Sequence, residues 1–224
     1  MNNGAGFAGD EKAIISPPER RKHMSTPTKE IKTTTEKLAS VIRIVTVPPV
    51  MVIALLLILY FYLPQPFGTL PELLTAIALL GLVPLLAYPL QPVFPHYRQR
   101  GREGQRELAF VLTGVGYTIA FLWALPAGTS PAVRTVCAGY FFSALLLTLC
   151  NKVLHRRASG HACSAVGPLL FLIYYFGWWL LLPSVVIAAL IAWASVTLRR
   201  HTPIDLLWGT LCSMFGFAIA VLWF

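Results

Sequence analysis

The chain has 224 residues, of which 56% are hydrophobic and only 12% are charged, and its mean hydropathy is +0.67. Soluble domains carry about 25% charged residues, so this composition excludes an ordinary water-soluble domain and indicates a chain whose solvent is largely lipid. The net charge of +9 would suit a nucleic-acid-binding protein, but most of the chain is too apolar to offer a soluble basic face.

Residues 1–40 are polar, carry charges of both signs and contain no apolar run that would serve as a signal peptide. We expect them to form a disordered tail in the cytoplasm. The remainder, residues 41–224, is expected to form one helical membrane domain.

Seven apolar segments of about 14–22 residues follow the tail, and the sixth is short compared with the ~20 residues that a spanning helix needs. They are 44–63, 70–90, 108–125, 132–150, 162–181, 185–198 and 203–224. Pro48 and Pro49 should kink or break the first segment, and a tight turn is expected near Pro183. The pattern predicts an all-α, polytopic transmembrane helix bundle with about six to seven spanning helices.

Basic residues are distributed very unevenly between the two sides of this bundle. All of the 18 Lys and Arg residues except Arg134 lie before the first apolar segment or in three links on one side, 91–107, 151–161 and 199–202. The links on the opposite side contain none. Short cytoplasmic loops collect Lys and Arg, so this basic face is predicted to be cytoplasmic.

The segment His201-Thr-Pro-Ile-Asp205 opens the last apolar stretch on the basic face. Thr202 can cap the helix, and Pro203 suits its first turn. Asp205 follows His201 by four residues, so the two face each other if the helical turn extends back. A carboxylate on one imidazole nitrogen would leave the other as a nucleophile. An acid that only favours the helix dipole explains Asp205 equally well.

The segment Arg157-Ala-Ser-Gly-His161 precedes the fifth apolar stretch on the same face. A helix N-terminus offers free N–H groups to an anion, and Gly160 permits close backbone approach while Ser159 adds a hydroxyl. Arg157 and Lys152 supply positive charge for phosphate oxygens, and His161 is suited to donate a proton to a leaving oxygen. Taken alone, a basic loop with a small-residue turn accounts for the same residues.

Together the two segments place two histidines, an acid, a Ser-Gly turn and several cations on one face. Metal-free phosphoryl transfer needs such groups, because its catalysis is mainly positioning and charge neutralisation. The segments resemble the type 2 phosphatidic acid phosphatase superfamily, which carries the motifs KxxxxxxRP, PSGH and SRxxxxxHxxxD. The resemblance covers about residues 151–209, with Ala158-Ser159-Gly160-His161 in place of PSGH and His201-x-x-x-Asp205 ending the third motif.

The resemblance implies a role for each residue. His201 would be the nucleophile that forms a phosphohistidine, Asp205 would orient it, and His161 would protonate the leaving lipid alkoxide. The phosphate-binding residues would be Lys152, Arg157, Ser159, Gly160 and Arg200. It implies no cofactor and no metal.

This sequence departs from the family pattern at two places. Lys152 and Arg157 are too close together for the first motif, and no proline follows Arg157. The arginine expected six residues before His201 is Ser195, so one phosphate-binding cation is missing or relocated. Arg102 or Arg106, from a link on the same face, could supply it.

The resulting hypothesis is a membrane phosphatase that hydrolyses a lipid phosphomonoester or diphosphate, such as an isoprenoid diphosphate or a phosphatidate-like lipid. Its partners would be that substrate and the surrounding membrane lipids. Two alternatives stay open: a non-catalytic protein that binds or transports an anionic lipid, and a phosphotransferase with an acceptor other than water.

Overall fold

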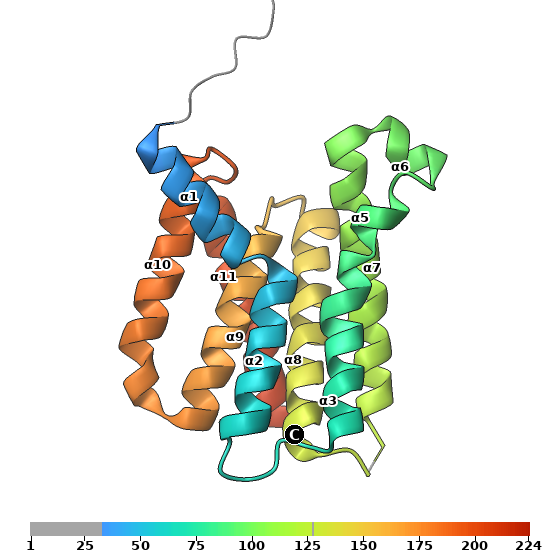
Figure 1. Ribbon diagram of the computed structural model, residues 1–224, viewed down its shortest axis with the longest axis vertical. Coiled ribbons are helices and arrows are strands. Elements are labelled where there is room, and N and C mark those ends of the chain that lie inside the picture. Colours follow the sequence, from blue (N-terminus) through green and yellow to red (C-terminus); the bar gives the residue numbers. More distant parts are fainter. Residues whose placement is uncertain (1–32, 127) are drawn as a thin grey trace, which may run out of the picture. The chain divides into compact units, whose positions relative to one another are not determined.

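The computed structural model describes residues 33–126 and 128–224, and all regular secondary structure in these ranges is helical (Figure 1). Several of the helices are long and apolar. The sequence-based prediction of an all-α, polytopic membrane helix bundle is confirmed.

The helices follow the apolar segments closely, with irregular turns inside two of them. They are α1 (Thr34–Val45), α2 (Pro48–Tyr62), α3 (Leu70–Ala76), α4 (Val83–Leu85), α5 (Ala87–Leu90), α6 (Pro95–Gln99), α7 (Gly101–Ala124), α8 (Pro131–Thr148), α9 (Gly160–Phe176), α10 (Leu181–Thr197) and α11 (Pro203–Trp223). The π-helical turns η1 (Ile77–Leu82) and η2 (Leu149–Val153) continue α3 and α8, and the 3-10 turn η3 (Trp178–Leu180) leads into α10.

Five helical stretches in the described residues are long and apolar enough to cross a membrane: Leu70–Leu90, Gly101–Ala124, Pro131–Val153, Trp178–Thr197 and Pro203–Trp223. The pair α1 and α2 meets the same criteria together, with a bend of 53° between the two helices. The bend lies where Pro48 and Pro49 begin α2, because proline suits a first turn but interrupts a helix that precedes it. The predicted break is therefore confirmed. Helix α9 is shorter, with 17 residues.

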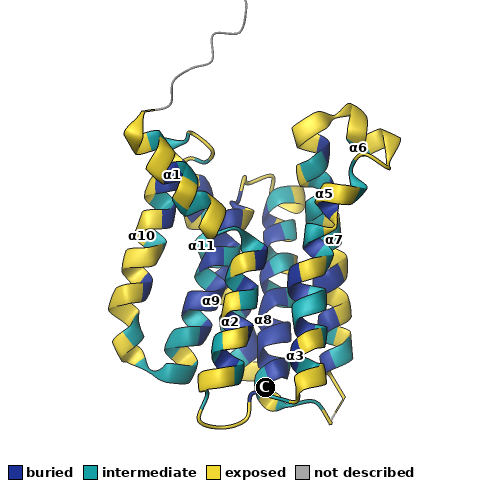
Figure 2. Cartoon of the chain, in the orientation of Figure 1, coloured by how far each residue is buried: buried dark blue, intermediate teal, exposed yellow. Residues whose placement is uncertain are grey.

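Burial shows how the bundle meets its surroundings (Figure 2). Helix α10 is apolar almost throughout, yet only Ser184, Ile191, Ala194 and Ser195 are buried in it. Its outward side chains include Val185, Val186 and Leu190, all well exposed. An apolar surface of this kind suits a lipid solvent, because its exposure to water is unfavourable.

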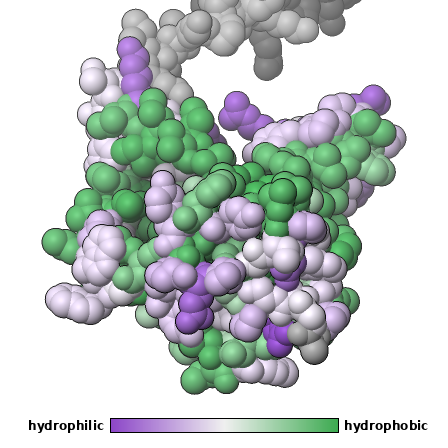
Figure 3. Space-filling model, turned by 60° about the horizontal axis from the view of Figure 1, so that its bottom comes forward, coloured by the Kyte–Doolittle hydropathy of each residue, from purple (hydrophilic) through white to green (hydrophobic). Residues whose placement is uncertain are grey.

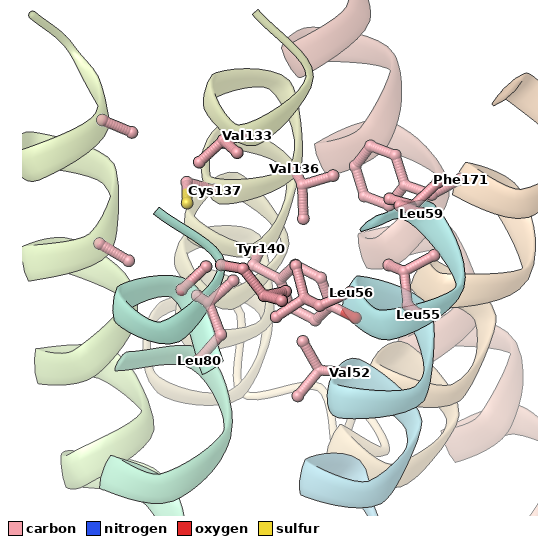
Figure 4. Packing of buried hydrophobic residues seen from close by; sticks show 14 of the residues in the cluster. Val52, Leu55, Leu56, Leu59, Leu80, Val133, Val136, Cys137, Tyr140 and Phe171 are labelled. Atoms are coloured by element: carbon pink, nitrogen blue, oxygen red, sulfur yellow. The ribbon is translucent and has the colours of Figure 1, made fainter. Parts of the chain in front are cut away.

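The core lies between α2, α7, α8 and the turn η1 (Figure 4). Leucines and valines of α2 meet Val133, Val136 and Cys137 of α8, and Phe171 of α9 closes the cluster from the side. Close packing of these fully buried side chains fixes the helices against one another. It thereby fixes α8 and α9, and α11 in turn packs against both of them, which positions the two sequence motifs.

Two expectations from the sequence are wrong in detail. The tail was expected to be disordered to residue 40, but Thr34–Ser40 belong to α1, which begins with a capping box between Thr33 and Glu36. Residues 1–32 of that tail lie outside the described residues. The expected turn near Pro183 lies at Gly177, whose φ of 111° suits glycine, so Pro183 falls in the first turn of α10 instead.

The two ends of the bundle differ in polarity. Helices α9 and α11 both begin at the end where α1 and α6 lie (Figure 1). The opposite end is formed by residues 63–69, 125–126 and 128–130 and by Gly177. Figure 3 brings this end forward, and its strongly hydrophilic surface is confined to small patches among pale and hydrophobic side chains. The basic links 91–107, 151–161 and 199–202 connect helices at the end that carries both motifs (Figure 1).

Candidate functional site

Each histidine motif forms the N-terminus of a helix. Ser159 caps α9, and its hydroxyl accepts a hydrogen bond of 3.2 Å from the amide of Ala162. Thr202 caps α11 in a capping box with Asp205, whose carboxylate accepts a 3.0 Å hydrogen bond from the Thr202 amide. These caps fix where each chain segment enters its helix.

The two motifs are joined through the backbone. The amide of Ser159 donates a hydrogen bond of 2.8 Å to the carbonyl oxygen of Asp205. Gly209, one turn further along α11, lies so close to Ser159 that a Cβ there would overlap the Ser159 carbonyl oxygen. Only glycine allows this approach, which brings the start of α11 against the start of α9.

A cavity of about 820 Å³ opens beside this junction. At the charged end of the bundle its walls include both histidines, and further in they become apolar and aromatic. The inner walls include Tyr117, Tyr140, Phe171 and Phe217. From His161 to Phe171 the cavity follows α9 for ten residues, or roughly 15 Å at 1.5 Å per residue.

His201 lies in the wall of the cavity with its side chain only 8% exposed. Its Nδ1 is 3.8 Å from Oδ2 of Asp205, which is too long for a hydrogen bond, and this nitrogen has no hydrogen-bond partner within the described residues. Asp205 thus lies on the predicted side of His201 without the predicted hydrogen bond. Burial and then the charge of Arg43 lower the pKa of His201 to about 4, so this imidazole is neutral at pH 7.

His161 is 9% exposed and also lines the cavity. Its Nε2 is 3.4 Å from the hydroxyl oxygen of Thr46. That hydroxyl donates its own hydrogen to the carbonyl oxygen of Ile42 at 2.8 Å, so it can only accept from the imidazole. This arrangement assigns the proton of neutral His161 to Nε2.

Of the expected phosphate-binding residues, Lys152, Arg157 and Gly160 line the cavity. Gly160 opens α9, so its amide lies in the first turn, where no intrahelical acceptor exists. Nε of Arg157 is 3.7 Å from Oδ2 of Asp205, and the arginine side chain is 64% exposed. An exposed pair of this kind is weak, so Arg157 remains available to an anion.

Ser159 and Arg200 lie elsewhere. Ser159 is fully buried and its hydroxyl caps α9, and the described walls of the cavity do not include it. Its part in the site is therefore structural, contrary to the expected phosphate contact. Arg200 faces a smaller hollow on the other side of His201, together with Arg199 and Val196.

The links that carry the motifs leave their preceding helices through strained residues. Arg199 has a φ of 51°, and His155 has a φ of 49°, values that favour glycine. Helix α10 ends in a Schellman motif, in which the amides of Arg199 and Arg200 return to Val196 and Ser195. The turn reverses the chain directly before His201.

Asn151 holds the other link, although it belongs to neither of the two histidine motifs. Its side-chain oxygen accepts from the amide of Ala158 at 3.1 Å, while its amide nitrogen donates to the carbonyl oxygens of Leu147 and Ala158. This double contact ties the end of α8 to the start of α9. In the sequence, a side-chain amide as the first residue of a basic link is the pattern that could have indicated this role.

Helix α1 and the bend that follows it supply two further residues to the site. Thr46 contacts His161, and the guanidinium of Arg43 lines the cavity. Of the two arginines expected to supply the missing cation, Arg106 lies in the cavity wall, whereas the described walls do not include Arg102. Sequence alone gave no signal for Arg43 or Thr46, because their helix was assigned to the tail and the edge of the first span.

No group of three His, Cys, Asp or Glu side chains within residues 33–126 and 128–224 is placed to hold a metal ion. The four cysteines, Cys137, Cys150, Cys163 and Cys212, are buried and unbridged. Comparison of the chain with protein-family models, with curated proteins and with solved structures gave no match. Function is therefore inferred from the residues of the site and their geometry.

Proposed function

We propose that this protein is a membrane lipid phosphatase that hydrolyses a lipid phosphomonoester or diphosphate through a phosphohistidine on His201. One observation carries the proposal. His161, His201, Lys152, Arg157 and Gly160 line the charged end of a single cavity whose inner walls are apolar. A phosphate head group and a lipid chain suit the two parts of such a cavity. The proposal places the protein in the type 2 phosphatidic acid phosphatase superfamily.

In the first step, Nε2 of His201 attacks the phosphorus atom. A P–N bond forms, the P–O bond to the lipid breaks, and the leaving oxygen takes a proton from His161, which acts as an imidazolium stabilised by the phosphate dianion of the bound substrate. In the second step, a water molecule gives a proton to the neutral His161 and attacks the phosphohistidine, which releases phosphate and restores the His201 imidazole and the His161 imidazolium.

The electrostatics of the site favour this sequence. A nucleophilic imidazole must be unprotonated, and the pKa of His201, lowered to about 4, keeps it so at neutral pH. Charge on the phosphoryl oxygens would be met by Lys152 and Arg157 and by the first-turn amide of Gly160.

The depth of the cavity supports a lipid substrate. Its extent of roughly 15 Å along α9 is about half of the ~30 Å hydrocarbon core of a bilayer. Tyr140, Phe171 and Phe217 form its inner end. A hydrocarbon chain attached to the phosphate would enter the bundle among these aromatic rings, with the head group held at the charged end.

The proposed orientation places the site on the cytoplasmic side. The basic links 91–107, 151–161 and 199–202 lie at the end of the helix bundle that carries the candidate site. The positive-inside rule expects such basic links on a cytoplasmic face. Cysteine labelling from either side of sealed vesicles, with Lys37→Cys as the site-end probe in a background whose four native cysteines are replaced by serine or alanine, tests this orientation.

A second function, binding of an anionic lipid without turnover, is favoured by the 3.8 Å separation between His201 and Asp205. An unoriented imidazole would be a poor nucleophile. Transfer of the phosphoryl group to an acceptor other than water would use the same phosphohistidine and differ only in the second step.

The proposal is tested by phosphate release from a panel of lipid phosphomonoesters and diphosphates, with and without a chelator. Wild-type protein should release phosphate, and His201→Asn should not. His155→Asn is the matched control, because His155 is exposed, and asparagine tolerates its left-handed backbone. Lipid binding without release in the wild type would establish the second function instead, and full activity in His201→Asn would reject the mechanism.

A further inference from the structure

The guanidinium of Arg43 occupies an unusual place at the charged end of the cavity. It is half-buried on α1 and lines the cavity wall, and its Nη1 donates a hydrogen bond of 3.2 Å to the hydroxyl of Ser195. In the part of the chain that the structure describes, Arg43 forms no ion pair. The acids Glu103 and Glu107, which share the cavity wall, are both paired with Arg100.

A half-buried arginine without an ion pair among the described residues is suited to binding an anion. A guanidinium has five N–H donors, and the bond to Ser195 uses one of them. Removing a charge from water without a counter-charge is costly. A phosphate group would offer both the counter-charge and two oxygens for the planar fork of the guanidinium.

Arg43 also lies close to the reacting groups. Thr46, one helical turn beyond Arg43, contacts Nε2 of His161. The charge of Arg43 is the second-largest cause, after burial, of the lowered pKa of His201. One chain segment thus contacts one histidine and acts electrostatically on the other.

The partner of Arg43 explains how an arginine from α1 reaches this place. Helix α1 packs against α10, and Ser195 of α10 is fully buried beneath it. A serine leaves room for the guanidinium at the position where the resemblance led us to expect an arginine. The cation is present at the site, but it comes from a different helix.

We propose that Arg43 binds the phosphate group of the substrate, so that α1 contributes directly to the site. This inference rests on the proposed function for its effect on rate. Its effect on phosphate binding is independent of turnover.

The test compares Arg43→Ala with Lys37→Ala, which removes the same charge from an exposed position on the same helix. Binding of inorganic phosphate to purified full-length protein in detergent is measured by equilibrium dialysis. Arg43→Ala should weaken binding about 10- to 100-fold, as expected for loss of charged hydrogen bonds, while Lys37→Ala should bind like wild type. Equal binding by wild type and Arg43→Ala, or no binding by the wild type, would overturn the proposal.

Turnover provides a second readout. Arg43→Ala should lower kcat/KM by about 10²-fold or more, and Arg43→Lys should fall between it and wild type because an ammonium group cannot bind bidentately. Adding Ser195→Arg to Arg43→Ala should restore part of the loss. If His201→Asn is inactive while Arg43→Ala keeps full activity, the phosphatase proposal survives and Arg43 has no role. If the wild type binds phosphate through Arg43 but hydrolyses nothing, Arg43 is a phosphate-binding residue and the phosphatase proposal fails.

Discussion

The amide of Ser159 and the carbonyl oxygen of Asp205 form a 2.8 Å hydrogen bond, which joins the two histidine motifs through the backbone. This contact is made where α9 and α11 begin, with Gly209 allowing the two helices to approach. The relative positions of His161 and His201 therefore depend on helix packing as well as on their own side-chain conformations. In-line phosphoryl transfer requires such positioning, because small displacements of reacting groups are costly in rate.

Gly209→Ala tests this dependence. The added Cβ would overlap the Ser159 carbonyl oxygen, a backbone atom that cannot move aside cheaply. We expect α11 to shift from α9 and kcat to fall by about 10²-fold. Gly128→Ala is the control, because a Cβ there would meet no described atom within 4 Å and the residue lies outside the described cavity walls. Normal phosphate release by Gly209→Ala would show that the junction does not set the site geometry.

Asp205→Asn separates two roles of the same side chain. An asparagine oxygen can still accept from the Thr202 amide, so the cap and the fold should be retained. The charge beside His201 would be lost, and we expect kcat to fall by about 10²- to 10⁴-fold, as when an orienting carboxylate is neutralised in a catalytic triad. Phosphate release should be measured together with thermal stability. Unchanged kcat would mean that Asp205 serves only the helix N-terminus.

The lowered pKa of His201 predicts how its contribution to folding stability depends on pH. An unfolded chain takes up a proton on histidine near pH 6.5, whereas folded His201 does so only at about 4. Between these values the unfolded state binds more protons, so the contribution of His201 to stability is present above pH 6.5 and is lost as the pH falls toward 4.

Nuclear magnetic resonance of protein labelled with ¹⁵N-histidine measures this directly, with the His201 signals assigned from their absence in His201→Asn. At pH 5.5 the His201 ring should still give the nitrogen shifts of a neutral imidazole. A ring that is half protonated near pH 6.5 would contradict the environment described for it.

The inner cavity predicts a dependence on the lipid chain. Gly114 lines the cavity, and a Cβ added there would meet no described atom within 4 Å, so Gly114→Phe should fill part of the cavity without disturbing the backbone. Turnover of long-chain lipid phosphates should fall about tenfold or more, while a short-chain phosphomonoester should be affected much less. The control is Val115→Phe, a neighbouring position that is 47% exposed and outside the described cavity walls. Equal losses of turnover for long-chain and short-chain substrates would show that the lipid chain does not enter the bundle.

Much of the fold could be predicted from the sequence because hydrophobic segments of spanning length are a strong signal. The break at Pro48 and Pro49 followed from the chemistry of proline. The turn at Gly177 was misplaced because Pro183 has two acceptable positions, in a turn or in the first turn of a helix, and only the positive φ of Gly177 decides between them.

The site was predictable where its residues are close in sequence and hidden where packing assembles it. His201 and Asp205 are four residues apart, so helix geometry relates them directly. Arg43 reaches Ser195 across 152 positions of the chain, through the packing of α1 on α10. Ser159 was misassigned because a serine before a helix can bind a ligand or cap the helix, and here the hydroxyl is buried in the cap.

The central claim is that His201 carries the phosphoryl group. Its most direct test is to mix purified protein with a lipid phosphate labelled at the phosphorus atom, to quench in alkali, where phosphohistidine survives, and to map the labelled peptide by mass spectrometry. The account predicts label on His201 in the wild type and none in His201→Asn. Turnover with no phosphorylated histidine, or label on another residue, would contradict it.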